Sequence, residues 1–258
     1  MVAGRVRPPR ADALQRLGRG AGQVSVSIRF DADAVASVEL GRLRLRHFDG
    51  SVPWRRWRSR HGQAHLSGSY WAATTGGHVV YESRLELARL LLADFDPQVT
   101  GIWAQPCRIL ASVDGRHRQH VPDFLLASRS GEVSVVNVKP AERLADSRVA
   151  EALAWPGELF RGHGWRYEVW SGCDPVVLEN VRFLAAYRRP GVVDEDLIAR
   201  AWREVRDGEP LGDAERRLAG GGPGWAVRPG LLTLLWRSRL TTDLSRPLSG
   251  DAILRRCA

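Results

Sequence analysis

Residues 99–140 read VTGIWAQPCRILASVDGRHRQHVPDFLLASRSGEVSVVNVKP, and this stretch decides the fold. It contains three runs rich in strand-forming residues, at 102–111, 121–127 and 132–139. The turn-forming pairs Asp114-Gly115 and Ser130-Gly131 lie between the runs. Such pairs favour tight hairpins. The three runs are therefore predicted to be strands that pair as antiparallel neighbours.

Helices and one more strand are predicted on either side of this stretch. Upstream, in YESRLELARLLLADFDP, Leu87, Leu90 and Leu91 recur at helical spacing and Pro97 ends the helix. Downstream, DSRVAEALAWPGELFRGHG is helical with an interruption at Pro156, and WRYEVWSG is a strand. A helix between two strands allows the second strand to lie parallel to the first. The order helix, three strands, helix, strand predicts a compact α/β core.

The chain before this core contains two further segments. QVSVSIRF and VELGRLRLRHF, residues 23–30 and 38–48, alternate in the manner of strands and are predicted to form a hairpin. Residues 1–23 are rich in Arg, Gly, Ala and Pro and show little periodicity. They are therefore predicted to be a flexible basic arm.

The pattern changes after Asp174-Pro175. Three segments show helical spacing: VVLENVRFLAAYRRP, DEDLIARAWREVRDG and GLLTLLWRSRL. LTTDLSRPLSGD, which follows them, is predicted to be a tight turn between two short strands. Three helices ending in a small hairpin resemble a winged-helix module, so a domain boundary is placed near residue 175. The glycine-rich LAGGGPGWA is predicted to be a loop, without the spacing of a phosphate-binding motif.

The composition is that of a globular protein. The 258 residues are 44% hydrophobic and 26% charged, which is enough for a real core in one or two domains. No apolar run approaches the length of a membrane span, and the Arg- and Pro-rich start lacks the apolar stretch of a signal peptide. Cys107, Cys173 and Cys257 are scattered, without the spacing of a zinc site or a disulfide framework. We expect a cytoplasmic protein that does not enter a membrane.

The net charge of +9 is concentrated in residues 1–70, where 13 arginines face 5 acidic residues. Arginine binds phosphates bidentately and releases their counterions, so a polyanion such as double-stranded DNA is the expected partner. Aromatic residues alternate with these cations: Trp54, Trp57, Tyr70 and Trp71. The mixture suits contact with the DNA backbone together with stacking on bases or sugars. The alternative is a solvated basic face whose aromatic residues belong to the core.

The chain has 38 lysine and arginine residues, and only one of them is a lysine: Lys139, in VSVVNVKPAERL. Its ammonium group is a compact donor with a tunable pKa that can reach a phosphate oxygen or an attacking water. A guanidinium group is always charged and takes no part in proton transfer. Lys139 is therefore a candidate catalytic residue. The alternative is a solvated cation at a strand end before Pro140.

Further candidate residues are predicted to lie near Lys139. Asn137 is two positions earlier and shares its strand face, and the hairpin brings Asp123 alongside. Glu86 comes from the preceding helix. The two carboxylates can hold Mg²⁺ with several waters, with the Asn137 amide or the Val138 carbonyl as an auxiliary ligand. We expect Mn²⁺ to substitute for Mg²⁺.

These residues also have alternative roles. Ser83-Arg84-Leu85-Glu86 matches the S-x-x-E capping box, in which Glu86 satisfies a backbone N–H. Glu82 lies four residues earlier on the same helix face and is a second candidate ligand. Asp123 alone is also compatible with a turn. His120 is a candidate contact to DNA or to the catalytic water, or else a surface histidine.

At these residues the chain resembles the TnsA-type endonuclease subunit of heteromeric transposases, a branch of the PD-(D/E)xK, restriction-endonuclease-like superfamily. The matching segments, within residues 65–190, are ESRLELARLLLADFDP, GIWAQP, VPDFLL and VNVKPAERL. By position, the family's catalytic glutamate, aspartate and lysine correspond to Glu86, Asp123 and Lys139. The family commonly has Gln two residues before the lysine, where this chain has Asn137.

The resemblance implies an α/β fold with a restriction-endonuclease-like mixed-sheet core, followed by a small helical winged-helix-like domain. The implied domains are a basic arm at 1–23, a basic extension plus the nuclease core at 24–174, and a partner-binding domain at 175–258. The implied activity is Mg²⁺-dependent hydrolysis of DNA at the 5′ ends of a mobile element. A DDE-type transposase subunit would act at the 3′ ends, and an AAA+ ATPase regulator would contact the C-terminal domain. Such a subunit is expected at the nucleoid.

The predicted DNA contacts come from the basic segment and from the approach to Asp123: Arg55, Arg56, Trp57, Arg58, Arg60 and His120. Two other functions stay open. One is a stand-alone restriction-type or repair endonuclease. The other is a catalytically inactive DNA-binding assembly module, with which Asn137 in place of Gln is compatible.

Overall fold

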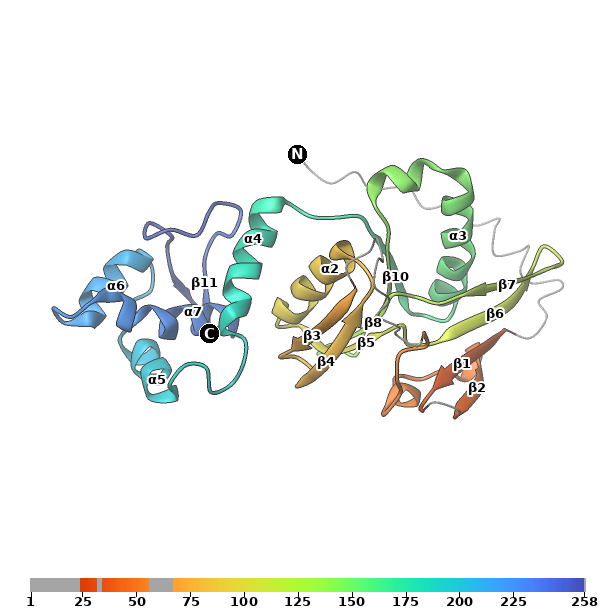
Figure 1. Ribbon diagram of the computed structural model, residues 1–258, viewed down its shortest axis with the longest axis horizontal. Helices are drawn as coiled ribbons and strands as arrows, with labels where there is room; N and C mark the ends of the chain where they lie inside the picture. The colour runs from red at the N-terminus through yellow and green to blue at the C-terminus, as the bar shows by residue number, and fades with distance from the viewer. Residues whose placement is uncertain (1–23, 32–33, 56–66, 258) are drawn as a thin grey trace.

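A computed structural model describes residues 24–31, 34–55 and 67–257. It shows a mixed α/β protein with several sheets and, within those ranges, six α-helices. Figure 1 shows the two four-stranded sheets toward one end of the molecule and the C-terminal helices, with β11, at the other. The predicted α/β class is confirmed. The arm predicted over residues 1–23 lies outside the described residues.

The central sheet has the strand order β10-β9-β8-β5. Its strands are β5 (Val99–Ala104), β8 (Phe124–Ser128), β9 (Val133–Val138) and β10 (Arg166–Trp170). β8 pairs antiparallel with both β5 and β9, and β10 lies parallel to β9. The hairpin predicted at Ser130-Gly131 and the parallel neighbour reached through a helix are therefore confirmed. Gly131 has a φ of 82° in this turn, which only glycine adopts at little cost.

A second sheet has the strand order β2-β1-β6-β7. Its strands are β1 (Ser25–Arg29), β2 (Val35–Glu39), β6 (Arg108–Val113) and β7 (Arg116–His120). The predicted N-terminal hairpin is present as β1 and β2, which pair antiparallel. Its second half was predicted wrongly, because residues 40–42 and 45–48 form short 3-10 helices. These turns leave Leu43 and Phe48 fully buried, which favours them over a continued strand.

The first strand predicted in the central stretch is two strands in two sheets. β5 ends at Ala104 and the chain turns at Gln105, which has a φ of 45° and precedes Pro106. The Asp114-Gly115 turn then links β6 to β7 within the second sheet. The prediction of one continuous strand over residues 102–111 is therefore wrong, because the chain turns at Gln105 within this run.

Helices α2 (Arg84–Phe95) and α3 (Ser147–Gly162) cover opposite faces of the central sheet. Leu90 of α2 packs in one core with Phe124 and Val136. Phe160 of α3 packs in the other core with Val135. Successive residues of β9 thus point to different cores, as the alternation along a strand requires.

Both of these helices were predicted. α2 ends with Asp96 as its C-cap, immediately before Pro97. Pro156 lies inside α3 without ending it, so the predicted interruption does not break the helix.

β3 (Gly68–Ala72) and β4 (Gly77–Tyr81) form an antiparallel hairpin that the sequence patterns did not predict. Tyr70 is buried, and its hydroxyl donates to Asp94 Oδ2 at 2.7 Å. The Asp94 carboxylate also accepts two backbone N–H groups from the hairpin turn. For Tyr70, the alternative of an aromatic residue in the core is confirmed.

The C-terminal part contains four helices and a two-stranded ribbon. These elements are α4 (Pro175–Leu184), α5 (Glu195–Glu204), α6 (Leu211–Ala219), α7 (Arg228–Trp236), β11 (Leu240–Thr241) and β12 (Arg255–Arg256). α4, α5 and α7 correspond to the three predicted helices. α6 was missed, although Leu211, Ala214 and Leu218 recur at helical spacing and are buried.

The terminal ribbon differs from the predicted tight turn over residues 240–251. β11 pairs with β12, so the second strand lies beyond that segment. Asn180 of α4 holds the intervening loop, because its Nδ2 donates to the carbonyls of Leu244 and Arg246 and its Oδ1 accepts the Leu248 N–H. A side chain from another helix therefore organises this loop, which no local pattern reveals.

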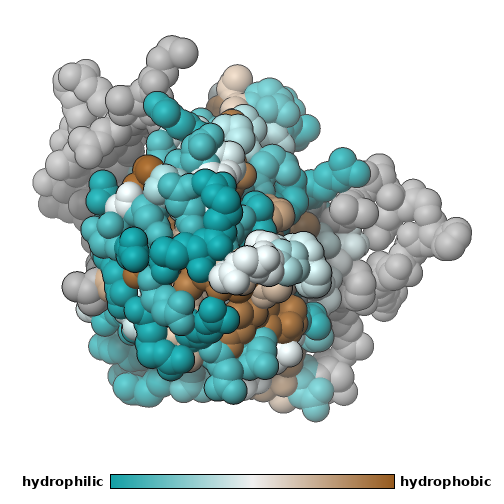
Figure 2. Space-filling model, turned by 90° about the vertical axis from the view of Figure 1, so that its left-hand side faces the viewer, coloured by the Kyte–Doolittle hydropathy of each residue, from teal (hydrophilic) through white to brown (hydrophobic). Residues whose placement is uncertain are grey.

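One hydrophobic core extends across the boundary predicted near residue 175. It joins Leu90 and Phe124 with Val181, Leu231 and Leu235 of the C-terminal helices. Figure 2 shows that the face at the C-terminal end is mainly hydrophilic, with one apolar area. No helix in the described part of the chain has the length and apolar character needed to cross a membrane.

Candidate active site

Asp123 lies immediately before β8, at the end of the central sheet. Its backbone N–H donates to the Val136 carbonyl, and its own carbonyl accepts the Gln105 N–H. The Val138 N–H donates to Asp123 Oδ2 at 2.7 Å, and Asp123 is only 7% exposed. These bonds orient a buried carboxylate between two neighbouring strands. This environment disfavours the alternative of an exposed turn residue.

Lys139 follows the last residue of β9. Its backbone N–H donates to the Trp170 carbonyl at 2.9 Å, which holds the strand end against β10. Asn137 is 1% exposed, and its Oδ1 lies 2.7 Å from His120 Nε2. Asp123, Asn137 and Lys139 line the same open cavity of about 660 Å³. The structure thus brings these three candidate residues together.

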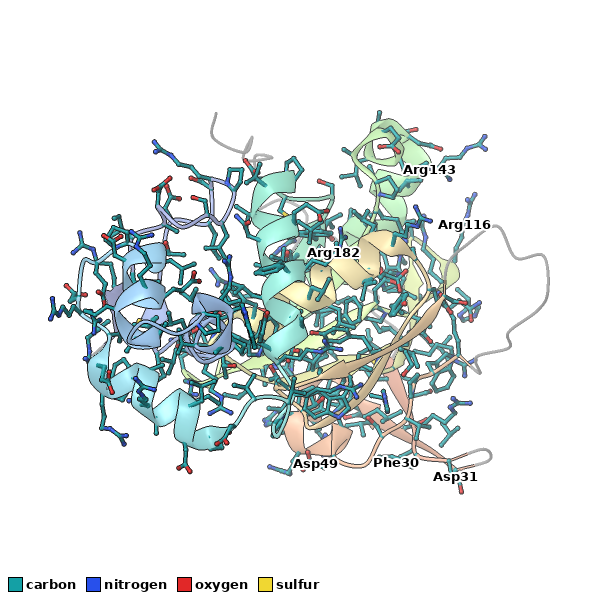
Figure 3. The ribbon with its side chains drawn as sticks, turned by 60° about the vertical axis from the view of Figure 1, so that its left-hand side comes forward. Phe30, Asp31, Asp49, Arg116, Arg143 and Arg182 are labelled. Carbon is teal, nitrogen blue, oxygen red and sulfur yellow. The ribbon has the colours of Figure 1, made fainter. Side chains whose placement is uncertain are left out.

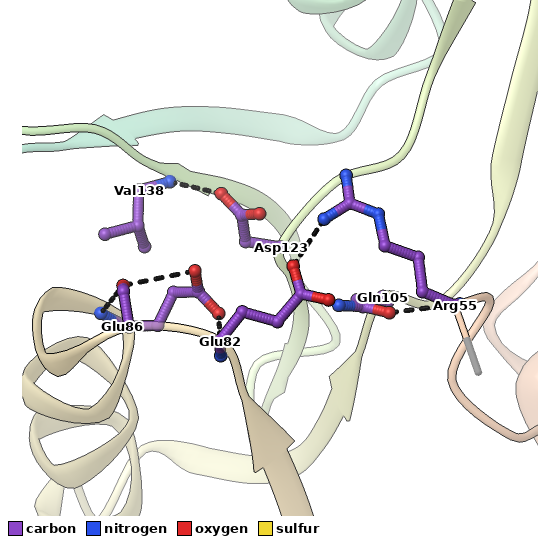
Figure 4. A network of polar contacts seen from close by, with 7 residues as sticks. Arg55, Glu82, Glu86, Gln105, Asp123 and Val138 are labelled. Atoms are coloured by element: carbon purple, nitrogen blue, oxygen red, sulfur yellow. Dashed lines mark hydrogen bonds and ion pairs between the residues drawn. The ribbon is translucent and has the colours of Figure 1, made fainter. Parts of the chain in front are cut away.

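Glu86 reaches the site from α2. Its backbone N–H donates to Ser83 Oγ at 3.1 Å. Glu86 Oε2 accepts the Glu82 N–H at 2.7 Å, and Oε1 accepts the Ser83 hydroxyl. Only half of the predicted capping box is present, because the Glu86 carboxylate accepts the N–H of Glu82 and not that of the N-cap residue Ser83. Glu86 does not line the cavity, but Figure 4 shows its carboxylate facing the same space as that of Asp123.

Burial is the main cause that raises the pKa of both carboxyl groups. For Asp123, the charges of Lys139 and Arg55 and the Val138 hydrogen bond oppose this increase. For Glu86, the charge of Asp123 adds to the effect of burial. Glu86 and Asp123 are therefore close enough for their charges to interact. A cation between them would stabilise both ionised forms.

The cavity is lined by more cations than anions. The positively charged side chains are Arg55, Arg108, Lys139, Arg143 and Arg148, and the negatively charged ones are Asp123 and Asp146. The guanidinium carbon of Arg108 lies 4.6 Å from the ring centre of Trp54. Arg143 lies beside α3 in Figure 3. Such a lining attracts a ligand that carries phosphate groups.

His120 is a partly buried member of the cavity wall. Burial, together with the charges of Lys139 and Arg55, lowers its pKa from 6.5 to about 4, although the hydrogen bond to Asn137 acts in the opposite direction. With Asn137 Oδ1 as acceptor, Nε2 carries the proton. The ring lies edge-on to Trp155, with 6.1 Å between the ring centres. His120 is therefore neutral at pH 7, in an environment unlike that of a freely solvated surface histidine.

Arg55, Glu82 and Gln105 extend the site away from the central sheet. Arg55 Nη1 forms an ion pair with Glu82 Oε2, and the Arg55 N–H donates to Gln105 Oε1 at 3.1 Å (Figure 4). Gln105 is 4% exposed. The sequence patterns did not single out Gln105. The available signal was an amide side chain before a proline inside an otherwise apolar run.

The predicted metal ligands differ in how well they suit a metal. Among the residues that the structure describes, no three Asp, Glu, His or Cys side chains lie close enough to hold one ion. Mg²⁺ is often bound by only one or two carboxylates, completed by waters and substrate phosphates. Glu86 and Asp123 fit that chemistry. Asn137 Oδ1 is engaged by His120, and its Nδ2 has no hydrogen-bond partner among the described residues, whereas Val138 contacts Asp123 through its N–H.

The predicted DNA contacts are described only in part. Arg55 and His120 line the cavity. Arg56, Trp57, Arg58 and Arg60 lie outside the described residues. The cavity residues Arg108, Arg143 and Arg148 were not predicted, because single arginines carry no spacing signal in a chain so rich in arginine.

No protein-family model matches the chain, and a search of curated proteins finds no match. The function is therefore argued from the residues and their geometry.

Proposed function

We propose that this chain is a Mg²⁺-dependent DNA endonuclease of the TnsA type. One observation carries the proposal: Asp123 and Lys139 share a cavity walled by arginines, within range of the charge of Glu86. Two acidic residues beside a lysine are a donor set suited to metal-assisted hydrolysis of phosphodiesters. The arginines supply the charge that DNA phosphates require.

The order of the elements supports the finer fold in this proposal. α2, then β5, β8 and β9, then α3 and β10 follow the succession expected of a restriction-endonuclease-like core. The C-terminal helices with the β11–β12 ribbon supply the parts of a winged-helix-like domain. In this proposal, residues 24–174 form the basic extension and nuclease core, and residues 175–258 form the partner-binding domain.

The proposed reaction is hydrolysis of a DNA strand. A divalent ion held by Glu86 and Asp123 would polarise the scissile phosphate and lower the pKa of a bound water. Lys139 orients the attacking water or donates a hydrogen bond to a non-bridging phosphate oxygen. The cavity arginines bind the flanking phosphates. In-line attack by the water forms a new bond to phosphorus and breaks the bond from phosphorus to the 3′ oxygen. The water loses its proton to solvent and the leaving 3′ oxygen takes one up from solvent, which gives a 5′-phosphate and a 3′-hydroxyl.

The proposal includes two protein partners. This subunit cuts at the 5′ ends of a mobile element, and a DDE-type transposase subunit acts at the 3′ ends. An AAA+ ATPase regulator contacts the C-terminal domain. Trp225, in the short 3-10 helix over Gly224–Ala226 before α7, is 76% exposed and offers an aromatic anchor for such a contact.

Cleavage of duplexes that carry the element ends, with and without the transposase partner, tests the proposal. Lys139→Arg keeps the charge but removes the compact amine, and should lower the rate by about 100-fold or more. Asp123→Asn should abolish Mg²⁺-dependent cleavage and leave DNA affinity intact or raised. Asp114→Asn is the matched control, because it makes the same change in the β6–β7 turn. Full cleavage by Lys139→Arg would refute the role of this lysine.

A second candidate is a catalytically inactive DNA-binding assembly module. The observation that favours it is Glu86, whose two carboxylate oxygens both accept hydrogen bonds at the start of α2. Titration calorimetry that shows DNA binding but no divalent-metal binding would support this candidate. Cutting by the isolated chain without a partner would instead indicate a stand-alone restriction-type or repair endonuclease.

A further inference from the structure

Arg55 is anchored to the backbone beside Asp123. Its N–H donates to Gln105 Oε1 at 3.1 Å, and the Gln105 N–H donates to the Asp123 carbonyl at 2.8 Å. The Trp54 N–H donates to the Gln105 carbonyl at 2.9 Å. Gln105 is 4% exposed and has a φ of 45°, an uncommon conformation for a residue with a side chain. This buried glutamine therefore sets where the Arg55 guanidinium can reach.

The guanidinium group of Arg55 forms an ion pair with the carboxylate of Glu82. Arg55 Nη1 pairs with Glu82 Oε2, while the Glu82 N–H donates to Glu86 Oε2. The charge of Glu82 raises the pKa of both Asp123 and Glu86, whereas the charge of Arg55 lowers the pKa of Asp123. Figure 4 shows the three carboxylates turned toward one space, with Arg55 at its edge. The charge of Glu82 thus acts on both proposed ligands, although the three carboxylates are not close enough to hold one ion while Arg55 is paired with Glu82.

We propose that Glu82 is a third carboxylate of the metal site, and that Arg55 is the cation which a divalent ion displaces from it. The inference rests on the proposed metal site at Glu86 and Asp123. A guanidinium group and a divalent ion compete for one carboxylate, because like charges repel at short range. The Arg55 and Glu82 side chains are 48% and 35% exposed, so their ion pair is weak enough to exchange. Glu82 then turns from Arg55 toward Asp123.

This exchange links metal binding to the substrate. Arg55 lines the cavity, so its guanidinium, once released by Glu82, binds a phosphodiester oxygen through parallel N–H groups. The divalent ion frees Arg55 for the phosphate, and the phosphate holds Arg55 away from Glu82. By linkage, the two ligands favour each other's binding.

Binding of Mn²⁺ alone to the full chain, without DNA, tests this inference. The free ion is measured by electron paramagnetic resonance. Arg55→Gln should bind Mn²⁺ about 3- to 10-fold more tightly than the unmodified chain, because a competing cation is lost. Glu82→Gln should bind at least about 3-fold more weakly. In the double variant the gain from Arg55→Gln should shrink, because the part that acts through Glu82 is lost and only the effect of the Arg55 charge on Asp123 remains.

Arg166→Gln is the matched control. Arg166 forms an exposed ion pair with Glu132 at 2.9 Å, so this change removes the same charge from the same kind of pair. Its Mn²⁺ affinity should equal that of the unmodified chain. Circular dichroism and thermal unfolding show whether each variant is folded.

Two results would overturn the inference: an Arg55→Gln variant that binds Mn²⁺ no better than Arg166→Gln, or a Glu82→Gln variant with unchanged affinity. Asp123→Asn separates this failure from failure of the proposed function. If only Asp123→Asn loses Mn²⁺, the metal site stands and the exchange between Arg55 and Glu82 is refuted. If Asp123→Asn binds normally, or if no form of the chain binds Mn²⁺, both proposals fail.

Discussion

Acidification should remove a contribution to stability that comes from His120. The ring is partly buried, its Nε2 donates to Asn137 Oδ1, and its edge meets Trp155. Protonation would place a positive charge there, near Lys139 and Arg55. Burial, together with these charges, lowers the pKa of His120 from 6.5 to about 4. The native state therefore takes up this proton at a lower pH than the unfolded chain does.

The sign and size of the effect follow from linkage. Because the folded pKa is lowered, the contribution of His120 to stability is full above pH 6.5 and declines as the pH falls toward 4. At pH 5 the loss amounts to about 2 kcal/mol. Asp123 and Glu86 act in the opposite direction, because their raised pKa values let the native state bind protons more readily as the pH falls. The total pH profile therefore mixes both signs.

Comparison with His120→Gln isolates the histidine. Urea unfolding is followed by tryptophan fluorescence at pH 8 and pH 5 for both chains. At pH 8 the variant should be less stable by about 1 kcal/mol, because the bond to Asn137 is weakened or lost. Between pH 8 and pH 5 the unmodified chain should lose about 2 kcal/mol relative to the variant.

His117→Gln is the control, because His117 is an exposed residue on the same strand. It should follow the pH dependence of the unmodified chain. If His120→Gln also follows that dependence, the reasoning about burial and charge at His120 is refuted.

Other expected outcomes concern buried polar groups. Asp94→Asn should lower the free energy of unfolding by about 3 kcal/mol, because the buried carboxylate accepts three hydrogen bonds; chemical denaturation measures the loss. Glu168→Gln should lower the free energy of unfolding by about 1 kcal/mol, because it weakens the ion pair in which Arg89 of α2 donates two hydrogen bonds to Glu168 of β10, a side chain that is 36% exposed. An unchanged denaturation midpoint would contradict this. Cys107, which is 1% exposed and whose pKa is raised to about 12 by burial, should react with Ellman's reagent only after denaturation, as mass spectrometry of labelled peptides would show.

Much of the central layer was predictable because its signals are local. The leucine spacing in α2, the Ser130-Gly131 turn and the helix between β9 and β10 are each contained in short segments. The break at Gln105 was not predictable in this way. Residues typical of strands lie on both sides of Gln105, and only the pairing of β6 with β1 and β7 separates β6 from β5. The competition between two sheets is a tertiary effect.

The candidate site was likewise predictable only in part. Lys139 was found because it is the one lysine in the chain, and Asp123 because the predicted hairpin brings it alongside; the resemblance chose Glu86 over Glu82. The environment of Asn137 was not predictable, because its partner His120 comes from another sheet. The contact between Arg55 and Glu82 likewise joins residues 27 positions apart.

By itself, the sequence determined what depends on near neighbours along the chain: α2, the β8–β9 hairpin, the parallel placement of β10 and the identity of the acidic and basic candidates. Only the tertiary structure decided which of those candidates meet, how deeply each is buried and which charge faces which. Distance and desolvation set the pKa values of Asp123 and His120 and the pairing of Arg55. Both quantities arise when segments far apart in the sequence are packed together, so residue spacing alone cannot supply them.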